Sequence, residues 1–437
     1  MRVAVIGAGV GGLTAAVELA AAGHRVTVFE RGAAPGGKCA RVDRNGFAWD
    51  AGPSLLTMPW VFRDLELELL RVEPVTRYEF ADGTSVELSA DLPRALEALE
   101  AWSPGSGADW ARFLGTCAGM WRASERFLTG PPPWPPRRPE PGEPLPDPRD
   151  ALRVKPWWTL RQLARAHARD PRLQMIVERF ATYAGGDPRR SPAALAVAGY
   201  VEHAFGAWHP RGGMYEIVRA LVRRLKGDLR LNEPVERILV TNGRVRGVAT
   251  ANGSFPADAV VAAIDEADVR PLAGLPPRRR EPSLGGQVLL LGVRDTPDVH
   301  HRILFPSNYD AEFDDIFVHR RMPRDPTLYV SAPSVTDPSE APGAWFVLVN
   351  APAAEAEFDD DAVIERLNVD VVHRERVRYG PIYGPAPHGR LSSLRRPGNR
   401  VRGVKGLWLA GGTVHPGGGL PLVALGGRSV ARQIGPA

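Results

Sequence analysis

Cysteine is scarce in this sequence, with only Cys39 and Cys117 among 437 residues. Two thiols cannot form a disulfide framework, so we expect both to be ordinary buried residues of a protein in a reducing cytosol. The sequence also lacks any run of about 18 uninterrupted apolar residues, roughly the length that a membrane-spanning helix needs. We therefore expect no transmembrane segment, and we expect no metal centre.

A concentrated basic surface is missing as well. The formal net charge is +5, and the arginines are scattered, with no stripe of basic residues interleaved with aromatic ones. A nucleic-acid partner is therefore not expected. Scattered arginines are either ordinary solvated surface residues, or they attract anionic lipid head groups weakly.

What the sequence does have is the composition of a folded protein, with 44% hydrophobic and 24% charged residues. A chain of this length is too long for one compact core, so we expect two intertwined domains. The first should be an α/β domain, discontinuous over residues 1–75, 207–268 and 395–437. The second should be an α+β domain made of residues 76–206 and 269–394.

The N-terminal residues 3–30 have the pattern strand, glycine turn, helix, strand. Residues 3–6 are a continuous apolar run, as a strand buried on both faces requires. Apolar residues of the stretch 13–20 recur on one face of a helix, which Gly23 ends. Residues 26–29 then form the second strand.

The turn within this unit is Gly7-x-Gly9-x-x-Gly12, and Glu30 ends the second strand. The glycines let the backbone approach a pyrophosphate, whose charge meets the N-terminus of the helix. The Glu30 carboxylate would accept hydrogen bonds from the ribose hydroxyls of an adenosine. The alternative is a plain glycine-rich turn, but strand, helix and acid all stand at the right spacing for a dinucleotide.

A second glycine pair follows Glu30 after five residues, in Gly36-Gly37-Lys38. It extends the phosphate cradle, and Lys38 or Arg41 can supply positive charge. This extension resembles the flavoproteins that include amine oxidases, protoporphyrinogen oxidases and carotenoid desaturases. The resemblance implies FAD as cofactor and a Rossmann-like first domain of the glutathione-reductase and amine-oxidase type. It also implies that the second, α+β domain is the substrate domain and faces the membrane. A second dinucleotide fingerprint is absent, which disfavours a pyridine-nucleotide reductase.

An antiparallel meander is expected later in the chain. Residues 235–240, 244–250 and 259–263 are its three strands, because Asn-Gly pairs separate them.

The remaining segments differ in character. Residues 160–225 and 359–373 are expected to be helical, and residues 406–432 to run strand, glycine-rich turn, helix. The proline-rich stretch 131–148 cannot be a helix or a central strand, so we interpret it as a surface loop.

The stretch from Gly46 to Pro59 resembles the "G-F-x-F-D-x-G-P-S/T" segment of phytoene-desaturase-like enzymes, with Trp49 where the family usually has Phe. The resemblance implies that this segment passes under the flavin ring. The residues it brings to the cofactor are then Gly52, Pro53, Ser54 and Leu55. Asp50 is expected to hold the turn rather than to take part in the chemistry.

Three further stretches carry the same resemblance, at residues 78–84, 183–188 and 206–214. They resemble the family's "F-x-D-G-T", "Y-x-G-G-x-P" and "G-x-W-x-P-x-G-G" segments. Val235 stands where the family places a valine backbone against the adenine.

The C-terminal stretch 407–421 resembles the carotenoid-desaturase signature "H-P-G-x-G-(I/L/V)-P". The resemblance implies that its glycines meet the ribityl chain and that Pro421 opens a helix whose N-terminal amides face the flavin. Its cofactor contacts would be Gly411, Thr413, His415 and Leu420. His415 is the one candidate for proton chemistry, although a ring packed against the flavin edge and held by a backbone bond is the simpler interpretation.

Within the family, the sequence of residues 411–421 is nearest to that of hydroxy- or methoxy-carotenoid 3,4-desaturases. The resemblance therefore implies desaturation at the 3,4 position of an acyclic, 1-hydroxylated carotenoid. A phytoene desaturase is the first alternative, and a flavin amine oxidase or a non-enzymatic escort protein are others.

The expected reaction needs little acid–base help from the protein. The carbon-4 hydrogen is allylic, so its loss as hydride to the flavin leaves a cation spread over the polyene, and the carbon-3 proton can then leave to a weak base or water. The main task of the protein is to orient the substrate in an apolar tunnel. Glu202, His203 and His209 are the candidates for a polar group that bonds the substrate hydroxyl. The electron acceptor is expected to be oxygen or a quinone.

A carotenoid lies in the bilayer, so the enzyme is expected to be cytoplasmic and peripherally bound to the inner face of the cell membrane. Trp157 and Trp158, near basic residues, have the make-up of an interfacial anchor. A tryptophan pair in the core of the helical region is the equal alternative.

Overall fold

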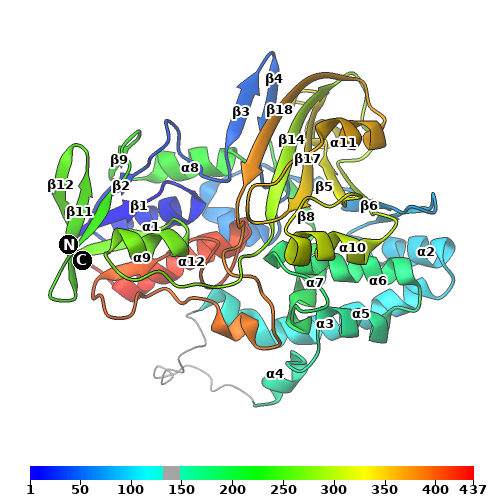
Figure 1. The fold of residues 1–437 in the computed structure, drawn as a ribbon, viewed down its shortest axis with the longest axis horizontal. Coiled ribbons are helices and arrows are strands. Elements are labelled where there is room, and N and C mark those ends of the chain that lie inside the picture. Colours follow the sequence, from blue (N-terminus) through cyan, green and yellow to red (C-terminus); the bar gives the residue numbers. More distant parts are fainter. Residues whose placement is uncertain (131–147) are drawn as a thin grey trace.

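The computed structural model describes residues 1–130 and 148–437, which form two sheets with helices around them (Figure 1). The proline-rich loop predicted for residues 131–148 falls outside the described residues except for Pro148, which begins a helix. Among the described helices, none combines the length and apolar character needed to cross a membrane.

A five-stranded parallel sheet forms the first part of the molecule, in the order β19–β13–β1–β2–β9. Its strands are β1 (Arg2–Ile6), β2 (Arg25–Phe29), β9 (Asp228–Arg230), β13 (Ala259–Ala262) and β19 (Leu407–Leu409). They come from the three chain segments that the sequence assigned to the nucleotide-binding domain, and the predicted Rossmann-like α/β class is confirmed.

Both faces of this sheet are covered, which explains the continuous apolar run in β1. Val3 and Val5 point to a core shared with helix α1, whereas Ala4 and Ile6 point to a core shared with a small antiparallel sheet. The helices on the first face are α1 (Val10–Ala21), α8 (Glu216–Arg224) and α12 (Leu420–Ile434). The small sheet consists of β10 (Arg237–Thr241), β11 (Arg244–Thr250) and β12 (Gly253–Pro256).

The prediction that residues 259–263 form the third strand of the meander was wrong. The small sheet ends with β12, and residues 259–262 are β13, which pairs with β1 in the parallel sheet. All four residues of β13 are buried, because β13 lies inside a sheet that is covered on both sides. A strand of the half-exposed meander would instead alternate apolar and polar residues.

The second part of the molecule is built on a seven-stranded sheet, antiparallel except where β15 pairs with β6. In spatial order its strands are β18 (Val371–Tyr379), β14 (Gly285–Val293), β17 (Ala344–Ala351), β16 (Leu328–Ser331), β15 (His301–Leu304), β6 (Thr76–Glu79) and β7 (Ser85–Leu88). Helix α11 (Asp360–Leu367) covers one face of it through Val363 and Leu367.

A layer of helices lies beside this sheet, at the lower right of Figure 1. Its members are α2 (Leu92–Trp102), α3 (Ser106–Thr129), α4 (Pro148–Arg153), α5 (Leu160–His167), α6 (Pro171–Glu178), α7 (Val197–Phe205) and α10 (Tyr309–Asp314). The long helix α3 contacts α2, α7 and also α12, so it joins the helical layer to the nucleotide-binding part.

Short elements complete the fold. The strands are β3 (Arg41–Arg44), β4 (Phe47–Asp50), β5 (Leu69–Val72) and β8 (Ala207–Pro210), and a further helix is α9 (Glu266–Leu272). Single helical turns are η1 (Pro59–Leu65), η2 (Arg179–Ala184), η3 (Ala193–Ala196), η4 (Asp315–His319), η5 (Pro333–Val335) and η6 (Ser392–Arg395).

Two predicted helical stretches are interrupted. The helix expected over residues 359–373 ends at Leu367, because Asn368 takes a left-handed conformation with φ 52° and the chain then enters β18. Residues of β18 alternate between exposed and half-buried, the period of a strand rather than a helix. Strand β8 likewise breaks the helical region 160–225, where it pairs with β5.

The two ends of the chain lie side by side (Figure 1). The amide of Ala437 donates to the carbonyl of Ala22, and the His24 ring bonds the carbonyl of Gly435 at 2.8 Å. The C-terminal helix is therefore fastened to the first βαβ unit. Both cysteines are buried and unpaired, as expected.

Candidate functional site

The first glycine loop has the geometry of a phosphate site. A methyl group on Gly12 would lie 2.1 Å from the carbonyl oxygen of Gly7, so only glycine permits this packing of helix on strand. A methyl group on Gly9 would lie 3.8 Å from its nearest neighbour, the carbonyl oxygen of Gly36, so there is space outside the loop. Helix α1 has no side-chain cap and no acidic residue in its first turn, which leaves its first amides available to an anion.

Glu30 is held beside this loop by two backbone amides. Its Oε2 accepts from the amide of Ala8 and its Oε1 from that of Gly32, both at 2.8 Å. The Glu30 carbonyl accepts from the amide of Glu233, which brings the segment before β10 next to it. Val235, the residue expected against the adenine, follows in that segment and is partly buried.

The second glycine pair lies against the first loop. The amide of Gly36 donates to the Ala8 carbonyl at 2.8 Å, and a methyl group on Gly37 would lie 3.3 Å from the Cα of Gly9. Lys38 is exposed at this place. Arg41 instead donates to the Gly212 carbonyl at 3.0 Å and lies 3.5 Å from the Glu340 carboxylate.

Asp50 holds the turn that leads into helix α8, as expected. Its carboxylate accepts from the amides of Met214 at 2.6 Å and Tyr215 at 3.1 Å, at the start of the helix. Burial raises the pKa of Asp50 to about 7, with a further contribution from the Glu340 carboxylate. The group therefore anchors backbone and faces no cavity that we detect in the described residues.

The C-terminal turn approaches the first glycine loop from the other side. A methyl group on Gly11 would lie 3.2 Å from the backbone of Gly411, so the two turns touch. The Thr413 hydroxyl is buried and accepts from the amide of Glu266 at 3.1 Å. Helix α12 begins at Leu420 with no side-chain cap, so its first amides are also available.

No sequence signal pointed to Arg396, which organises this turn. Its guanidinium donates to the carbonyls of Gly412, Val414 (2.9 Å) and Tyr383 (3.1 Å). Burial lowers the pKa of Arg396 to about 10, so the side chain stays charged at neutral pH. A lone arginine in a loop carries no spacing signal, and only the fold shows its partners.

His415 is buried and bonded to backbone. Its Nε2 lies 3.0 Å from the carbonyl oxygen of Gly130, at the end of α3. Burial lowers the pKa of His415 to about 4, so the ring is neutral at physiological pH. This geometry is that of a ring held by a backbone bond, the simpler of the two interpretations.

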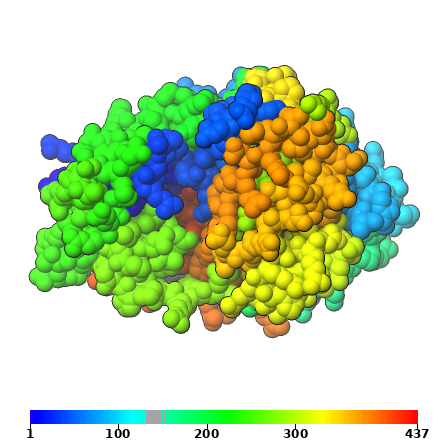
Figure 2. Space-filling model, turned by 45° about the horizontal axis from the view of Figure 1, so that its top comes forward, coloured from blue at the N-terminus to red at the C-terminus, as the bar shows by residue number. Residues whose placement is uncertain are grey.

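Together these segments fit a bound FAD. The space at Gly9, the free amides of two helix N-termini and the acid at the end of β2 supply what a dinucleotide needs. Figure 2 shows the surface hollowed between the N-terminal residues (blue) and the segment of β18 (orange), with C-terminal residues in red visible inside the hollow.

A cavity of about 1320 Å³ adjoins this site. One wall is formed by the segments expected at the flavin, including Pro53, Ser54, Leu55, His415 and Leu420. The opposite walls come from the helical layer and from the seven-stranded sheet, and they are mostly apolar. Such a space suits a long apolar substrate.

A buried polar cluster interrupts the apolar wall. Arg179 donates to the hydroxyls of Tyr183 and Tyr78 and lies 3.5 Å from the Glu202 carboxylate. Close by, the hydroxyls of Ser54 and Tyr329 are 2.6 Å apart. Burial raises the pKa of Glu202, and its Oε1 is buried without a hydrogen-bond partner.

The three candidates for the hydroxyl-bonding group have different positions. Glu202 lines the large cavity, whereas His203 lines only a second, much smaller one beside α7. His209 contacts neither cavity and lies near Asp337 and Glu340. The structure thus leaves Glu202 as the candidate at the cavity wall, joined by Arg179 and Tyr183, which the sequence did not indicate.

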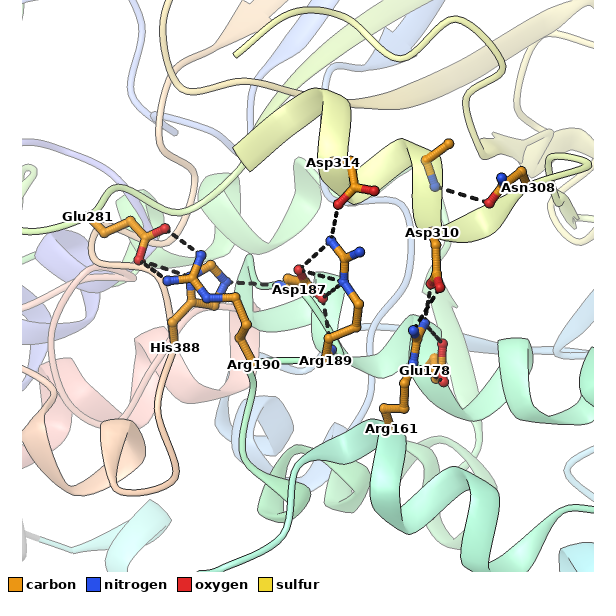
Figure 3. A network of polar contacts seen from close by, with 11 residues as sticks. Arg161, Glu178, Asp187, Arg189, Arg190, Glu281, Asn308, Asp310, Asp314 and His388 are labelled. Carbon is orange, nitrogen blue, oxygen red and sulfur yellow. Dashed lines mark hydrogen bonds and ion pairs between the residues drawn. The ribbon is translucent and has the colours of Figure 1, made fainter. Parts of the chain in front are cut away.

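A network of ion pairs runs from the cavity wall into the helical layer (Figure 3). Glu281 and His388 line the cavity, and the Glu281 carboxylate lies 2.7 Å from Arg190 and 3.1 Å from His388. Further along, Arg189 bridges Asp187 and Asp314, and Arg161 bridges Glu178 and Asp310. The last two bridges tie α10 to the other helices of the layer.

The two adjacent tryptophans point in different directions. Trp157 is 48% exposed, whereas Trp158 packs against the core with the Lys155 ammonium 4.7 Å from its ring centre. Exposed apolar side chains also occur at Leu391 and Leu394, which line the cavity. Trp158 therefore belongs to the core, and Trp157 has the exposure that an interfacial anchor would need.

Comparison with known proteins agrees with this geometry. The family model for flavin-containing amine oxidoreductases matches residues 10–286. A hydroxyneurosporene desaturase of Rubrivivax gelatinosus is 36% identical over 99% of this chain and 93% of that protein. A zeta-carotene-forming phytoene desaturase of Myxococcus xanthus is 32% identical, with the same coverage.

The fold has matches among solved structures as well. The crystal structure of an oxidoreductase from Methanosarcina mazei superposes with a TM-score of 0.64 over 99% of this chain and 100% of that chain, at 20% identity.

Proposed function

Because the chain belongs to the carotenoid desaturases of the flavin-containing amine oxidoreductase family, and is thus an FAD-dependent oxidoreductase, we propose that it desaturates the 3,4 position of an acyclic 1-hydroxylated carotenoid. The observation that carries the finer assignment is the Arg179–Tyr183–Glu202 cluster in the otherwise apolar cavity wall. A buried acceptor without a partner favours a substrate that brings a hydroxyl donor.

The cofactor contacts we propose follow the two turns. The pyrophosphate lies at Gly7, Gly9 and Gly12 with Gly36, Gly37 and Lys38 beside it, and the ribose and adenine lie at Glu30 and Val235. The flavin ring lies between residues 52–55 and the C-terminal turn with Gly411, Thr413, His415 and Leu420. When bound, FAD supplies the two-electron acceptor of the reaction.

The protein's own residues bind and orient the substrate rather than react with it. The apolar walls exclude water from the polyene, and the polar cluster fixes which end of the chain lies inside. His415 has a pKa of about 4 and its Nε2 is bonded to the Gly130 carbonyl, so it is a weak base, and we assign it to positioning the turn. The proton from carbon 3 would leave to water or another weak base, bound FAD would supply the hydride acceptor, and oxygen or a quinone would be the final electron acceptor.

We further propose peripheral binding at the inner face of the cell membrane. The side chains of Trp157, Leu391 and Leu394 are exposed. Leu391 and Leu394 line the cavity themselves, and so does Pro156, the neighbour of Trp157. An apolar patch beside the opening would bring the cavity to the lipid in which the substrate dissolves. Arg390 and Arg395, at the same opening, suit anionic head groups.

A substrate panel tests this function. Purified FAD-loaded protein in liposomes should desaturate 1-hydroxylated acyclic carotenoids well, lycopene poorly and phytoene not at all, as read by chromatography of the pigments. Conversion of phytoene to coloured products would instead support a phytoene desaturase, which the similarity to the Myxococcus xanthus enzyme keeps as the second candidate.

A further inference from the structure

Three ligand-type side chains meet at a place that neither cavity reaches. They are His209 in β8 and Asp337 and Glu340 in the loop between η5 and β17. One nitrogen or oxygen atom of each lies within 4.8 Å of the other two. All three residues are buried, with 1%, 0% and 5% of their surface exposed.

His209 is unusual because neither ring nitrogen has a hydrogen-bond partner. A buried imidazole left unpaired costs free energy, and native proteins rarely leave such groups unsatisfied. The neighbouring His300 packs edge-on against it with ring centres 5.2 Å apart, and its Nε2 is buried and unpaired too. The cluster therefore holds orphan nitrogen donors next to two carboxylates.

The carboxylates keep capacity for a further partner. Asp337 accepts from the amides of Gly212 and Ser339 and from the Ser339 hydroxyl, which uses three of its roughly four lone-pair sites. Glu340 Oε1 has no hydrogen bond and lies 3.5 Å from Arg41.

The surrounding charges leave room for a cation. The acidic groups are Asp337, Glu340 and the nearby Asp50, and the basic groups are Arg41 and Arg211. Arg211 lies 3.6 Å from Asp337 but 2.8 Å from Glu68, so its charge is shared with a fourth acid.

We propose that His209, Asp337 and Glu340 bind a divalent transition-metal cation, with Zn²⁺ as the best match to one imidazole and two carboxylates. Water completes the coordination. Since β8 leads into the turn that starts α8 while Asp337 and Glu340 precede β17, the ion joins the nucleotide-binding part to the seven-stranded sheet. Its role is structural, and it lies apart from the cavity.

The test uses the FAD-loaded protein without a histidine tag, purified without chelators. We expect about one equivalent of metal by mass spectrometry, a lower Tm after EDTA, and recovery of the Tm with Zn²⁺, because a ligand that binds only the folded state stabilises it. His209→Gln and Glu340→Gln should each weaken Zn²⁺ binding by about tenfold or more. His319→Gln, at an exposed histidine, should leave binding unchanged.

Absence of stoichiometric binding by the wild-type protein at micromolar Zn²⁺ or Mn²⁺ would overturn the proposal. So would binding that both glutamine variants retain in full, since the ion would then lie elsewhere. If His209→Gln loses its flavin through misfolding, Glu340→Gln and the wild-type titration decide, because Glu340 makes no backbone bond through the oxygen that faces the cluster.

Discussion

At the scale of single residues, the Glu30 carboxylate offers the sharpest test of the cofactor site. It is already oriented by the amides of Ala8 and Gly32, so no reorganisation is needed when a ribose arrives. Glu30→Ala should weaken FAD binding by about 10- to 100-fold, the value of a hydrogen bond to a charged group. Flavin absorbance of the purified protein and titration of the apoprotein measure this. Glu216→Ala, in the first turn of α8, is the matched control, and full flavin content in the Glu30 variant would contradict the site.

Glu202 should control the choice between hydroxylated and plain substrates. Glu202→Gln keeps the shape of the side chain but makes a weaker acceptor, so the preference in kcat/KM for the 1-hydroxylated carotenoid over lycopene should fall by about tenfold or more. His203→Gln, one residue on but outside the large cavity, should leave the preference unchanged. An unaltered preference in Glu202→Gln would remove this residue from the substrate site.

The lowered pKa of the buried His415 ring predicts that the stability of the protein depends on pH. Its pKa of about 4 in the folded protein lies below the usual 6.5 of the unfolded chain, so the unfolded state binds more protons between these values. The contribution of His415 to the free energy of unfolding is therefore complete above pH 6.5 and is lost as the pH falls towards 4, by about 2 kcal/mol at pH 5. The Tm of His415→Gln should fall less than that of the wild type between pH 7 and pH 5. Parallel curves for the two proteins would show that the ring is not buried as described.

The sequence predicts which site residues lie together where the signal is local. Gly9, Gly12 and Glu30 belong to one continuous βαβ unit, so their spacing alone brings them together. Glu202 and His203 were equal candidates, because sequence distance cannot tell which side of a helix faces a cavity. Arg179, the partner of Glu202, comes from a segment more than 20 residues away, and nothing in the sequence links the two.

At the scale of elements, the segment between α4 and α5 carries two adjacent tryptophans, and the sequence could not show which of them is exposed and which belongs to the core. Trp157→Ser should reduce binding to anionic liposomes while leaving the Tm unchanged, because the side chain is exposed. Trp158→Ser should lower the Tm, because it removes a ring from the core. Cosedimentation and thermal melts of both variants measure this. Equal liposome binding by Trp157→Ser and the wild type would contradict the anchor.

The error at residues 259–263 lies where tertiary burial decides which element forms. Residues 259–263 follow a hairpin and were assigned to it, yet β13 belongs to a sheet whose other strands are far away in sequence. The local pattern shows that a segment is apolar, but it does not show which sheet the segment will join.

At the scale of the whole molecule, the described residues contain one parallel sheet with a dinucleotide-type glycine loop, and we propose that this loop binds FAD. NADH and NADPH should therefore reduce the flavin slowly or not at all in anaerobic mixing, because no second glycine loop is available for them in residues 1–130 and 148–437. Absorbance at the flavin band gives the readout, with dithionite as the positive control. Bleaching by NADH at a rate near that of catalytic turnover would contradict the assignment.

The late position of β19 and α12 in the sequence has a consequence for how the protein is made. Strand β13 has no neighbour on one side until β19 pairs with it, and α1 lacks α12 until residues 420–434 have been added. During synthesis the nascent chain thus exposes an unpaired sheet edge and an uncovered helix face, both of which favour aggregation. The FAD site that we propose closes only after β19 and α12 have been made, so cofactor loading follows their synthesis and does not accompany that of the N-terminal βαβ unit.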